Sequence, residues 1–302
     1  MTDHTSLPIE SLLADICTGL KARKRLVLAA PPGAGKTTRV PLALAGLIDG
    51  FEALPGRVVM LEPRRLAARM AAERMAATLG EKTGGRIGLS TRIERKVSRE
   101  TVVEVITDGL FTRRLLADPS LEGVAAVIFD EIHERSLNAD LGLALALETQ
   151  SVFREDLHIL AMSATLDTEK VAGTLDAPVI ESDGRQYPVD TKYLGRNRDR
   201  IEDQMAAAIG KAVRAETGSV LAFLPGAGEI RRTAERLNNL PGDVSVHTLF
   251  GALSPREQDE AVRPAPAGQR KVVLATDIAE SALTIDGVHV VVDSGLARVP
   301  EF

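Results

Sequence analysis

The chain has 302 residues, of which 44% are hydrophobic, so it has room for about two domains with buried cores. Its formal net charge of −5 argues against attachment to nucleic acid through overall charge, while leaving room for one basic cleft. The one cysteine, Cys17, excludes an intrachain disulfide and a cysteine-cluster metal site. No apolar run reaches the roughly 18–20 residues of a membrane span and no signal peptide is evident, which predicts a soluble, cytoplasmic protein without membrane or disulfide partners.

The first elements along the chain are a predicted helix, a strand and a glycine-containing loop. Apolar residues at helical spacing between residues 12 and 20 predict the helix, and an apolar run at 25–29 predicts the strand. Residues 30–38, Ala-Pro-Pro-Gly-Ala-Gly-Lys-Thr-Thr, come next and lead into a second helix. Glycines let several backbone N–H groups point into one concavity, and the helix N-terminus adds partial positive charge. The segment therefore predicts a phosphate-binding loop.

Side chains of this loop suit a nucleoside triphosphate bound with Mg²⁺. Lys36 can reach the β- and γ-phosphates, and the Thr37 hydroxyl can ligate the metal. Ala30 occupies the first position of the motif, where glycine is usual. The cofactor-binding residues predicted here for ATP and Mg²⁺ are Gly33, Ala34, Gly35, Lys36, Thr37 and Thr38.

The next stretch alternates between strand and helix patterns and ends in an acidic motif. Strands are predicted at 57–61, 100–107 and 124–129, and helices at 67–79 and 108–117. The strand at 124–129 runs directly into Asp130 and Glu131, where ligands of parallel sheets bind. We expect Asp130 to hold Mg²⁺ through its water shell, and Glu131 to orient and deprotonate the attacking water.

A family resemblance emerges once the strand at 157–162 and the Ser-Ala-Thr that follows it are added. The quoted motifs are Gly33–Thr38, Glu62–Arg65, Thr107–Gly109, Asp130–Ser136 and Ser163–Thr165. In this order they resemble the DEAH-box branch of superfamily 2 helicases, although the core reads Asp-Glu-Ile-His in place of Asp-Glu-Ala-His. The opening Leu-Pro-Ile at 7–9 and the run 30–41 are most similar to bacterial HrpB-type ATP-dependent helicases.

Beyond a linker near residues 181–190, strand and helix patterns alternate again without a second phosphate loop. Strands are predicted at 189–194, 219–224, 244–249, 271–275 and 288–292, and helices at 201–216 and 227–240. Ser254 and Glu257 form a capping box that opens a further helix. The fold class is α/β, with tandem RecA-like P-loop NTPase domains at 1–180 and 181–302. Each is expected to be a mostly parallel sheet with helices on both faces.

The resemblance implies roles for further residues. It places His133 beside Glu131 and Lys36 in the catalytic set, as a residue that couples the two ligand sites. It also places Arg74 and Asp286 at the nucleotide, although Arg74 could equally be a solvated helix residue. The implied nucleic-acid contacts, all with the backbone of the strand, are Arg64, Arg92, Thr107, Gly226, Thr276 and Ser281.

Taken together, the motifs predict an ATP-dependent helicase that moves along single-stranded nucleic acid, with RNA favoured over DNA by resemblance. The sixth helicase motif, with its paired arginines, does not occur before Phe302. We therefore expect a fragment of a longer protein that binds nucleotide and hydrolyses it weakly. One alternative is a nucleotide-gated clamp that closes on a strand without unwinding. A P-loop kinase or GTPase is a second alternative, but it does not explain Glu131 beside Asp130.

Overall fold

The structure, a computed structural model, describes residues 7–165, 168–182, 188–195, 198–279 and 285–298. It divides into two compact units, Met1–Pro188 and Val189–Phe302, hereafter unit 1 and unit 2. Among the helices of the described residues, none combines the length and the apolar character needed to cross a membrane.

Unit 1 is built on an eight-stranded sheet with the order β4-β3-β5-β2-β6-β7-β1-β8. Neighbouring strands are parallel except β3 and β4, which are antiparallel. The strands are β1 Arg25–Ala29, β2 Arg57–Glu62, β3 Ile87–Ser90, β4 Arg95–Lys96, β5 Val103–Thr107, β6 Val124–Phe129, β7 His158–Ser163 and β8 Val179–Glu181. The central strands are apolar and buried along almost their whole length, because helices cover a parallel sheet on both faces.

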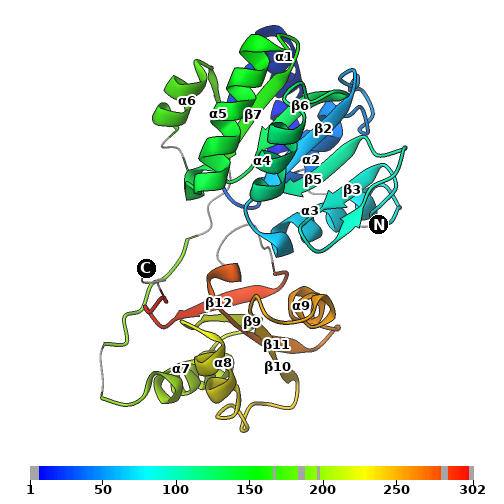
Figure 1. The fold of residues 1–302 in the computed structure, drawn as a ribbon. Helices are drawn as coiled ribbons and strands as arrows, with labels where there is room; N and C mark the ends of the chain where they lie inside the picture. Colours follow the sequence, from blue (N-terminus) through cyan, green and yellow to red (C-terminus); the bar gives the residue numbers. More distant parts are fainter. Residues whose placement is uncertain (1–6, 166–167, 183–187, 196–197, 280–284, 299–302) are drawn as a thin grey trace. The chain divides into compact units, whose positions relative to one another are not determined.

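The helices of unit 1 form two layers against this sheet. They are η1 Pro8–Leu12, α1 Leu13–Arg23, α2 Lys36–Leu44, α3 Arg65–Thr78, α4 Asp108–Ala117, η2 Ile132–Glu134, α5 Leu137–Val152 and α6 Glu169–Leu175. Residues such as Leu28 and Met60 point to the layer of α1, α2 and α3. Their neighbours Val27 and Phe129 point to the layer of α4, α5 and α6, where α4 and α5 lie side by side (Figure 1).

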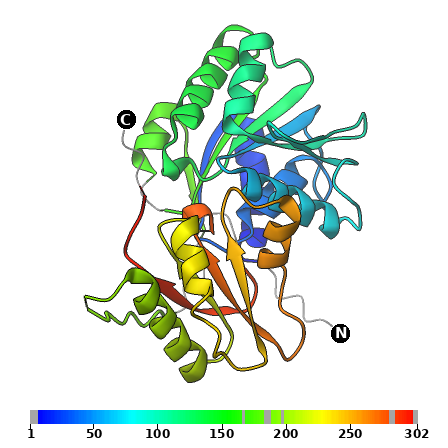
Figure 2. The same ribbon diagram turned by 60° about the horizontal axis from the view of Figure 1, so that its bottom comes forward.

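Unit 2 contains a four-stranded parallel sheet with the order β10-β11-β9-β12. Its elements are α7 Ile201–Ala215, β9 Ser219–Phe223, α8 Ala227–Ala234, β10 Val244–Leu249, α9 Pro255–Val262, β11 Arg270–Ala275, η3 Asp277–Ala279 and β12 Val288–Asp293. Val272 and Leu274 of β11 pack with the neighbouring helices α7 and α8 (Figure 2). Lys271 points the other way and donates to the carbonyls of Ala261 and Arg263, so α9 covers the opposite face.

The predicted fold class is confirmed, and most predicted elements lie within a few residues of the observed ones. The strand predicted at 189–194 is wrong: no strand forms in the described residues 188–195, where the side chains of Val189 and Tyr193 are 83% and 94% exposed. Its apolar residues lack a neighbouring strand in the described chain to pair with and a core to cover them. The helix predicted at 227–240 ends at Ala234, near which the Asn238 side chain donates to the Glu235 carbonyl.

Candidate nucleotide and nucleic-acid sites

The phosphate loop connects the end of β1 to the start of α2. Gly33 and Gly35 have φ angles of +78° and +94°, a left-handed conformation that a side chain would strain. Gly35 is the N-cap of α2, and Lys36 is its first residue, 4% exposed. The N-terminus of α2 therefore lies directly behind the loop.

Residues 7–10 contact the phosphate loop and the helix that follows it, which the sequence motifs did not indicate. Ile9 donates its N–H to the carbonyl of Ala34 at 3.1 Å. Glu10 forms an ion pair with Arg39 of α2 at 3.1 Å. A Cβ atom at Gly35 would come within 2.8 Å of a methyl group of Leu7, so the loop has no room for a side chain there.

Two short contacts join the loop to the acidic motif after β6. The ammonium group of Lys36 lies 2.8 Å from Oε1 of Glu131, and both side chains are almost completely buried. The Thr37 hydroxyl donates to Oδ2 of Asp130 at 2.6 Å. The structure thus brings together four predicted site residues. In each of the two contacts, the partners are more than ninety positions apart in the sequence.

The turn that carries Asp130 and Glu131 has an unusual backbone conformation. Glu131 has a φ angle of +50°, which is uncommon for a residue other than glycine, and such strain concentrates at functional sites. Its N–H donates to Oδ1 of Asp130 at 2.9 Å. Nδ1 of His133 lies 3.4 Å from Oε2 of Glu131 and accepts from the N–H of Ala164 at the same distance. His133 therefore links the acidic turn to the residues after β7.

Burial and neighbouring charges shift the pKa values of these groups. Burial and then the Asp130 charge raise the pKa of Glu131 to about 7, although Lys36 opposes the shift. Burial lowers the pKa of Lys36, but Asp130 and Glu131 outweigh it and raise that pKa above its ordinary value. Burial and then Lys36 lower the pKa of His133, so its ring is neutral at pH 7.

The oxygens beside the phosphate loop fit Mg²⁺. A hydroxyl from Thr37 and a carboxylate from Asp130 are hard oxygen donors, and Mg²⁺ commonly binds through one or two carboxylates while keeping several of its waters. Within the part of the chain that the structure describes, no three His, Cys, Asp or Glu side chains are grouped so as to hold a metal directly.

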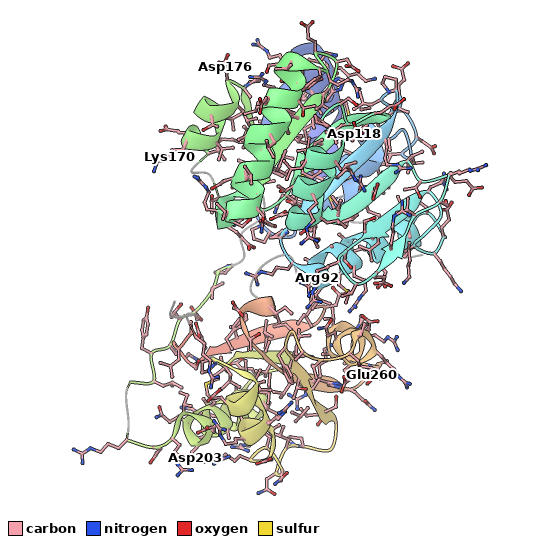
Figure 3. All side chains as sticks on the ribbon, in the orientation of Figure 1. Arg92, Asp118, Lys170, Asp176, Asp203 and Glu260 are labelled. Carbon is pink, nitrogen blue, oxygen red and sulfur yellow. The ribbon has the colours of Figure 1, made fainter. Side chains whose placement is uncertain are left out.

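Several predicted nucleic-acid residues lie at the carboxyl edge of the unit 1 sheet. Arg64 is the N-cap of α3, and Thr107 is the N-cap of α4. Arg92, exposed on the surface (Figure 3), and Thr107 both line a pocket of about 350 Å³. The other residues that line it are Gly109, Leu110, Thr112, Arg113 and Asn138. Arg113 and Asn138 were not predicted, because only the fold brings α4 and α5 together here.

The remaining predicted residues are divided between the two units. Arg74 is exposed on α3, and Asp286 is exposed in the segment before β12. Gly226 is the N-cap of α8, and the Thr276 hydroxyl accepts from the N–H of Ile278 at 3.5 Å. Ser281 lies outside the described residues.

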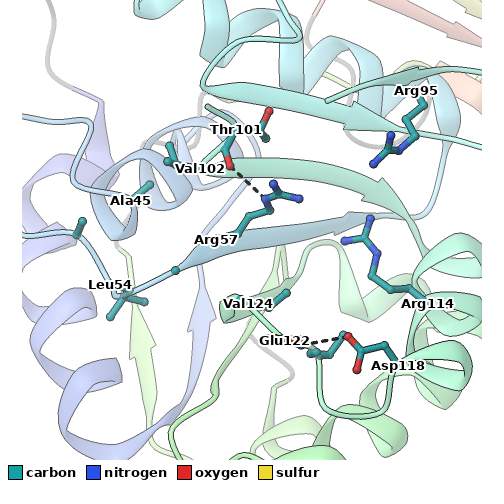
Figure 4. Close-up of a pocket in the computed structure, with 14 residues that line it drawn as sticks. Ala45, Leu54, Arg57, Arg95, Thr101, Val102, Arg114, Asp118, Glu122 and Val124 are labelled. Carbon is teal, nitrogen blue, oxygen red and sulfur yellow. Dashed lines mark hydrogen bonds between the residues drawn. The ribbon is translucent and has the colours of Figure 1, made fainter. Parts of the chain in front are cut away.

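A larger cavity, of about 610 Å³, lies at the opposite, amino edge of the unit 1 sheet. Arg57, Arg95 and Arg114 extend into it (Figure 4). The guanidinium groups of Arg57 and Arg114 donate to the buried carboxylate of Glu104, which balances one of their two positive charges. This cavity is remote from the phosphate loop in the fold.

Comparison with known proteins agrees with this arrangement. A family model described as DEAD/DEAH box helicase matches residues 11–173, more than half of the chain. The chain belongs to the DEAD/DEAH box helicase family. A second model, Helicase conserved C-terminal domain, matches residues 203–301. The predicted family is thereby confirmed.

Individual helicases of this family extend the comparison. The chain is 46% identical to the ATP-dependent RNA helicase HrpB of Escherichia coli over 301 residues, which cover 99% of this chain and 37% of HrpB. It is 35% identical to the E. coli ATP-dependent RNA helicase HrpA, of which it covers 23%. A crystal structure of E. coli DEAH/RHA helicase HrpB matches 97% of this chain with a TM-score of 0.90. The chain thus spans little more than a third of HrpB.

Proposed function

We propose that this chain is the ATP-hydrolysing part of a DEAH-box RNA helicase, using ATP with Mg²⁺ and contacting single-stranded RNA. The observation that carries the proposal is the buried Lys36–Glu131 pair beside the Thr37–Asp130 hydrogen bond. A phosphate-binding lysine, a metal-binding hydroxyl, a metal-binding carboxylate and a potential base meet at one strand edge. The names of the relatives HrpB and HrpA, both ATP-dependent RNA helicases, support this assignment.

Nucleotide binding would begin with an exchange of partners at Lys36. In the structure its ammonium group is held by Glu131 at 2.8 Å. The phosphates of ATP would occupy the concavity formed by the loop N–H groups and would draw this ammonium group onto the β- and γ-phosphates. Glu131 would then be released from its lysine partner and become available to the attacking water.

Glu131 is the proposed general base. A general base works best when its pKa lies near the working pH, because it is then partly ionised and still binds a proton well. Burial and the Asp130 charge raise the pKa of Glu131 to about 7. Its strained backbone fixes the carboxylate, and His133 lies against it. When bound, Mg²⁺ neutralises charge on the β- and γ-phosphate oxygens. Thr37 and Asp130 are the residues that would hold the ion.

Single-stranded RNA is the proposed second ligand, bound through its phosphates. Arg64, Arg92 and Thr107 supply two guanidinium groups and two helix N-termini at one edge of unit 1, and both features attract phosphate. Contacts of this kind position a strand without reading its sequence. The proposal therefore includes weak sequence preference and strong salt dependence.

Replacing the phosphate-binding lysine tests the nucleotide part of this proposal. Lys36→Ala should weaken Mg-ATP binding by well over tenfold, because charge-assisted hydrogen bonds are worth about 1.5–3 kcal/mol. Isothermal titration calorimetry of the 302-residue chain measures this affinity. Lys170→Ala, on the exposed surface of α6 (Figure 3), is the matched control and should bind like the parent chain. Equal affinity in the Lys36 variant would refute the assignment.

Turnover with RNA separates the helicase from the clamp that closes without unwinding. A steady-state ATPase assay with and without single-stranded RNA should show stimulation if RNA binding and hydrolysis are coupled. A chain that binds both ligands but whose turnover ignores RNA would favour the nucleotide-gated clamp.

A further inference from the structure

One carboxylate beside the nucleotide site has no part in the chemistry described so far. Glu62 is the last residue of β2, and Leu61 before it is paired in register with Phe129 of β6. Glu62, at the end of β2, therefore lies beside Asp130, which follows the end of the adjacent strand β6. The side chains of Met60 and Ile128 both face the layer of α1, α2 and α3, and strand side chains alternate. Glu62 and Asp130 accordingly share the face on which α2 lies.

The surroundings of Glu62 are costly for a carboxylate. The residue is 0% exposed, and neither of its oxygens accepts a hydrogen bond from a donor group of the described residues, although its carboxyl group lies against that of Asp130. Leaving a buried polar group unpaired costs about 1–3 kcal/mol, and more for a charged one. Burial, followed by the charges of Asp130 and Glu131, raises the pKa of Glu62 well above its ordinary value.

The neighbouring strand β5 carries a buried carboxylate that is stabilised by hydrogen-bond donors of the protein itself. Glu104 of β5 is also 0% exposed, but it accepts hydrogen bonds from Arg57, Arg114 and Ser90. Among the described residues no such donor serves Glu62, and the nearby cation, Lys36, is paired with Glu131. The carboxyl group of Glu62 therefore lies beside Asp130 and Glu131 without a donor of its own in the described part of the chain.

We propose that Glu62 is a positioning residue for the metal, with its carboxylate accepting hydrogen bonds from water molecules that Mg²⁺ keeps beside Asp130. This inference rests on the proposed function, because it requires Mg²⁺ to bind with nucleotide between Thr37 and Asp130. Mg²⁺ retains several waters in such sites, and those waters need acceptors. A carboxylate that accepts hydrogen bonds from these waters would orient the water shell and strengthen metal binding.

Metal binding with ADP tests this role without reference to turnover. Mn²⁺ serves as the probe, and electron paramagnetic resonance of the 302-residue chain counts free Mn²⁺ in the presence of ADP. Glu62→Gln keeps the shape of the side chain and should weaken Mn²⁺ binding by about 10–100-fold. Glu62→Ala should weaken it at least as much. Both variants should bind metal-free ADP with unchanged affinity.

The matched control is Glu104→Gln, a change of the same chemistry at a buried site on the neighbouring strand. It should lower the melting temperature, since it breaks the pairing with Arg57 and Arg114, and leave Mn²⁺ affinity unchanged. Glu62 variants that lose thermal stability but bind Mn²⁺ within twofold of the parent chain would overturn the inference alone. A parent chain that binds no Mn²⁺ with ADP would overturn the proposed function and this inference together.

Discussion

Lys36 and Glu131 form a buried ion pair between the phosphate loop and the acidic turn. The pair keeps a lysine charged at a site where burial alone would lower its pKa. On the proposed function, nucleotide would compete with Glu131 for the ammonium group. Removing the negative charge of Glu131 should therefore affect binding and hydrolysis in opposite directions.

Glu131→Gln separates these two effects. The amide keeps the size of the side chain but cannot accept the proton of the attacking water, so the ATP turnover of a chain extended through the sixth helicase motif should fall about 100-fold or more. ATP binding should be retained or improved, because Lys36 no longer has an anionic partner. Steady-state turnover and calorimetry on the same preparation measure both quantities. Glu148→Gln, on the exposed side of α5, is the control, and normal hydrolysis by the Glu131 variant would place the base elsewhere.

The raised pKa of Glu131 predicts how activity depends on pH. A carboxylate with a pKa of about 7, above its ordinary value of 4.5, is largely protonated below neutrality and cannot serve as a base. The value of kcat/KM for ATP should therefore fall below pH 7, by about tenfold per pH unit, and level off above it. A pH–rate profile that stays flat down to pH 5 would show that another group takes the proton.

The sequence predicted the identity of these site residues better than their contacts. Thr37 and Asp130 were predicted because a glycine loop and an acidic pair each follow an apolar strand, and the structure places them 2.6 Å apart. Their functional roles stay predictions. The direct Lys36–Glu131 pairing was not foreseen, since no motif states what a lysine contacts without its ligand. The burial of Glu62 beside Asp130 without a hydrogen-bond donor among the described residues was not predicted either, because it depends on how the strands pack.

At the scale of elements, three predicted nucleic-acid residues share one position. Arg64, Thr107 and Gly226 are the N-caps of α3, α4 and α8, and none uses its side chain to cap the helix. In α4 and α8 the first-turn carboxylates of Asp108 and Glu229 accept from their own backbone N–H groups, whereas the first turn of α3 carries no acidic residue. The remaining N–H groups of these helix starts can bind another acceptor. A strand phosphate is the acceptor that the proposed function supplies.

Arg64→Ala tests this use of the helix starts. The side chain pairs with Glu134 at 3.4 Å and is one-quarter exposed, so it sits at the surface beside the acidic motif. Its loss should weaken binding of poly-U and poly-A about equally and reduce the salt slope by about one. Fluorescence anisotropy at several salt concentrations gives both numbers. Arg99→Ala, an exposed arginine at the amino edge, should change neither.

Elements differed in how well the sequence predicted them. Helix α9 was predicted from Ser254 and Glu257, and the reciprocal capping box is present because both hydrogen bonds are local. The short strands β3, β4 and β8, which lie at or next to the edges of the unit 1 sheet, were missed, since runs of two to four residues carry little periodicity. Their pairing depends on neighbouring strands that are distant in the sequence.

At the scale of the whole molecule, each unit has its own core. Two clusters of buried side chains lie within residues 9–175, and a third lies within 205–274. All the residues proposed to hold phosphate and metal belong to unit 1. Nucleotide should therefore stabilise unit 1 through its own binding free energy.

Hydrogen exchange with and without Mg-ADP measures where this stabilisation appears. Ligand at 100 times its dissociation constant adds about 2.7 kcal/mol to the unit that binds it. Amides of β1 and α2 should therefore exchange more slowly with Mg-ADP, and the Lys36→Ala chain should show no such protection. Protection that appears only within residues 205–274 would contradict the assignment of the site to unit 1.

The brace formed by Ile9 against Ala34 has a consequence for how the phosphate loop works. A free loop of glycines and small residues samples many shapes, and a ligand that selects one of them loses affinity in proportion. Here the docking of residues 7–10 selects the shape during folding, before any ligand arrives. On the proposed function, affinity for nucleotide would therefore depend partly on residues outside the phosphate loop. Trimming the chain past Glu10, or fusing a bulky tag directly before Leu7, would leave the loop free to change shape. The entropy cost of ordering the loop would then oppose nucleotide binding and lower the affinity.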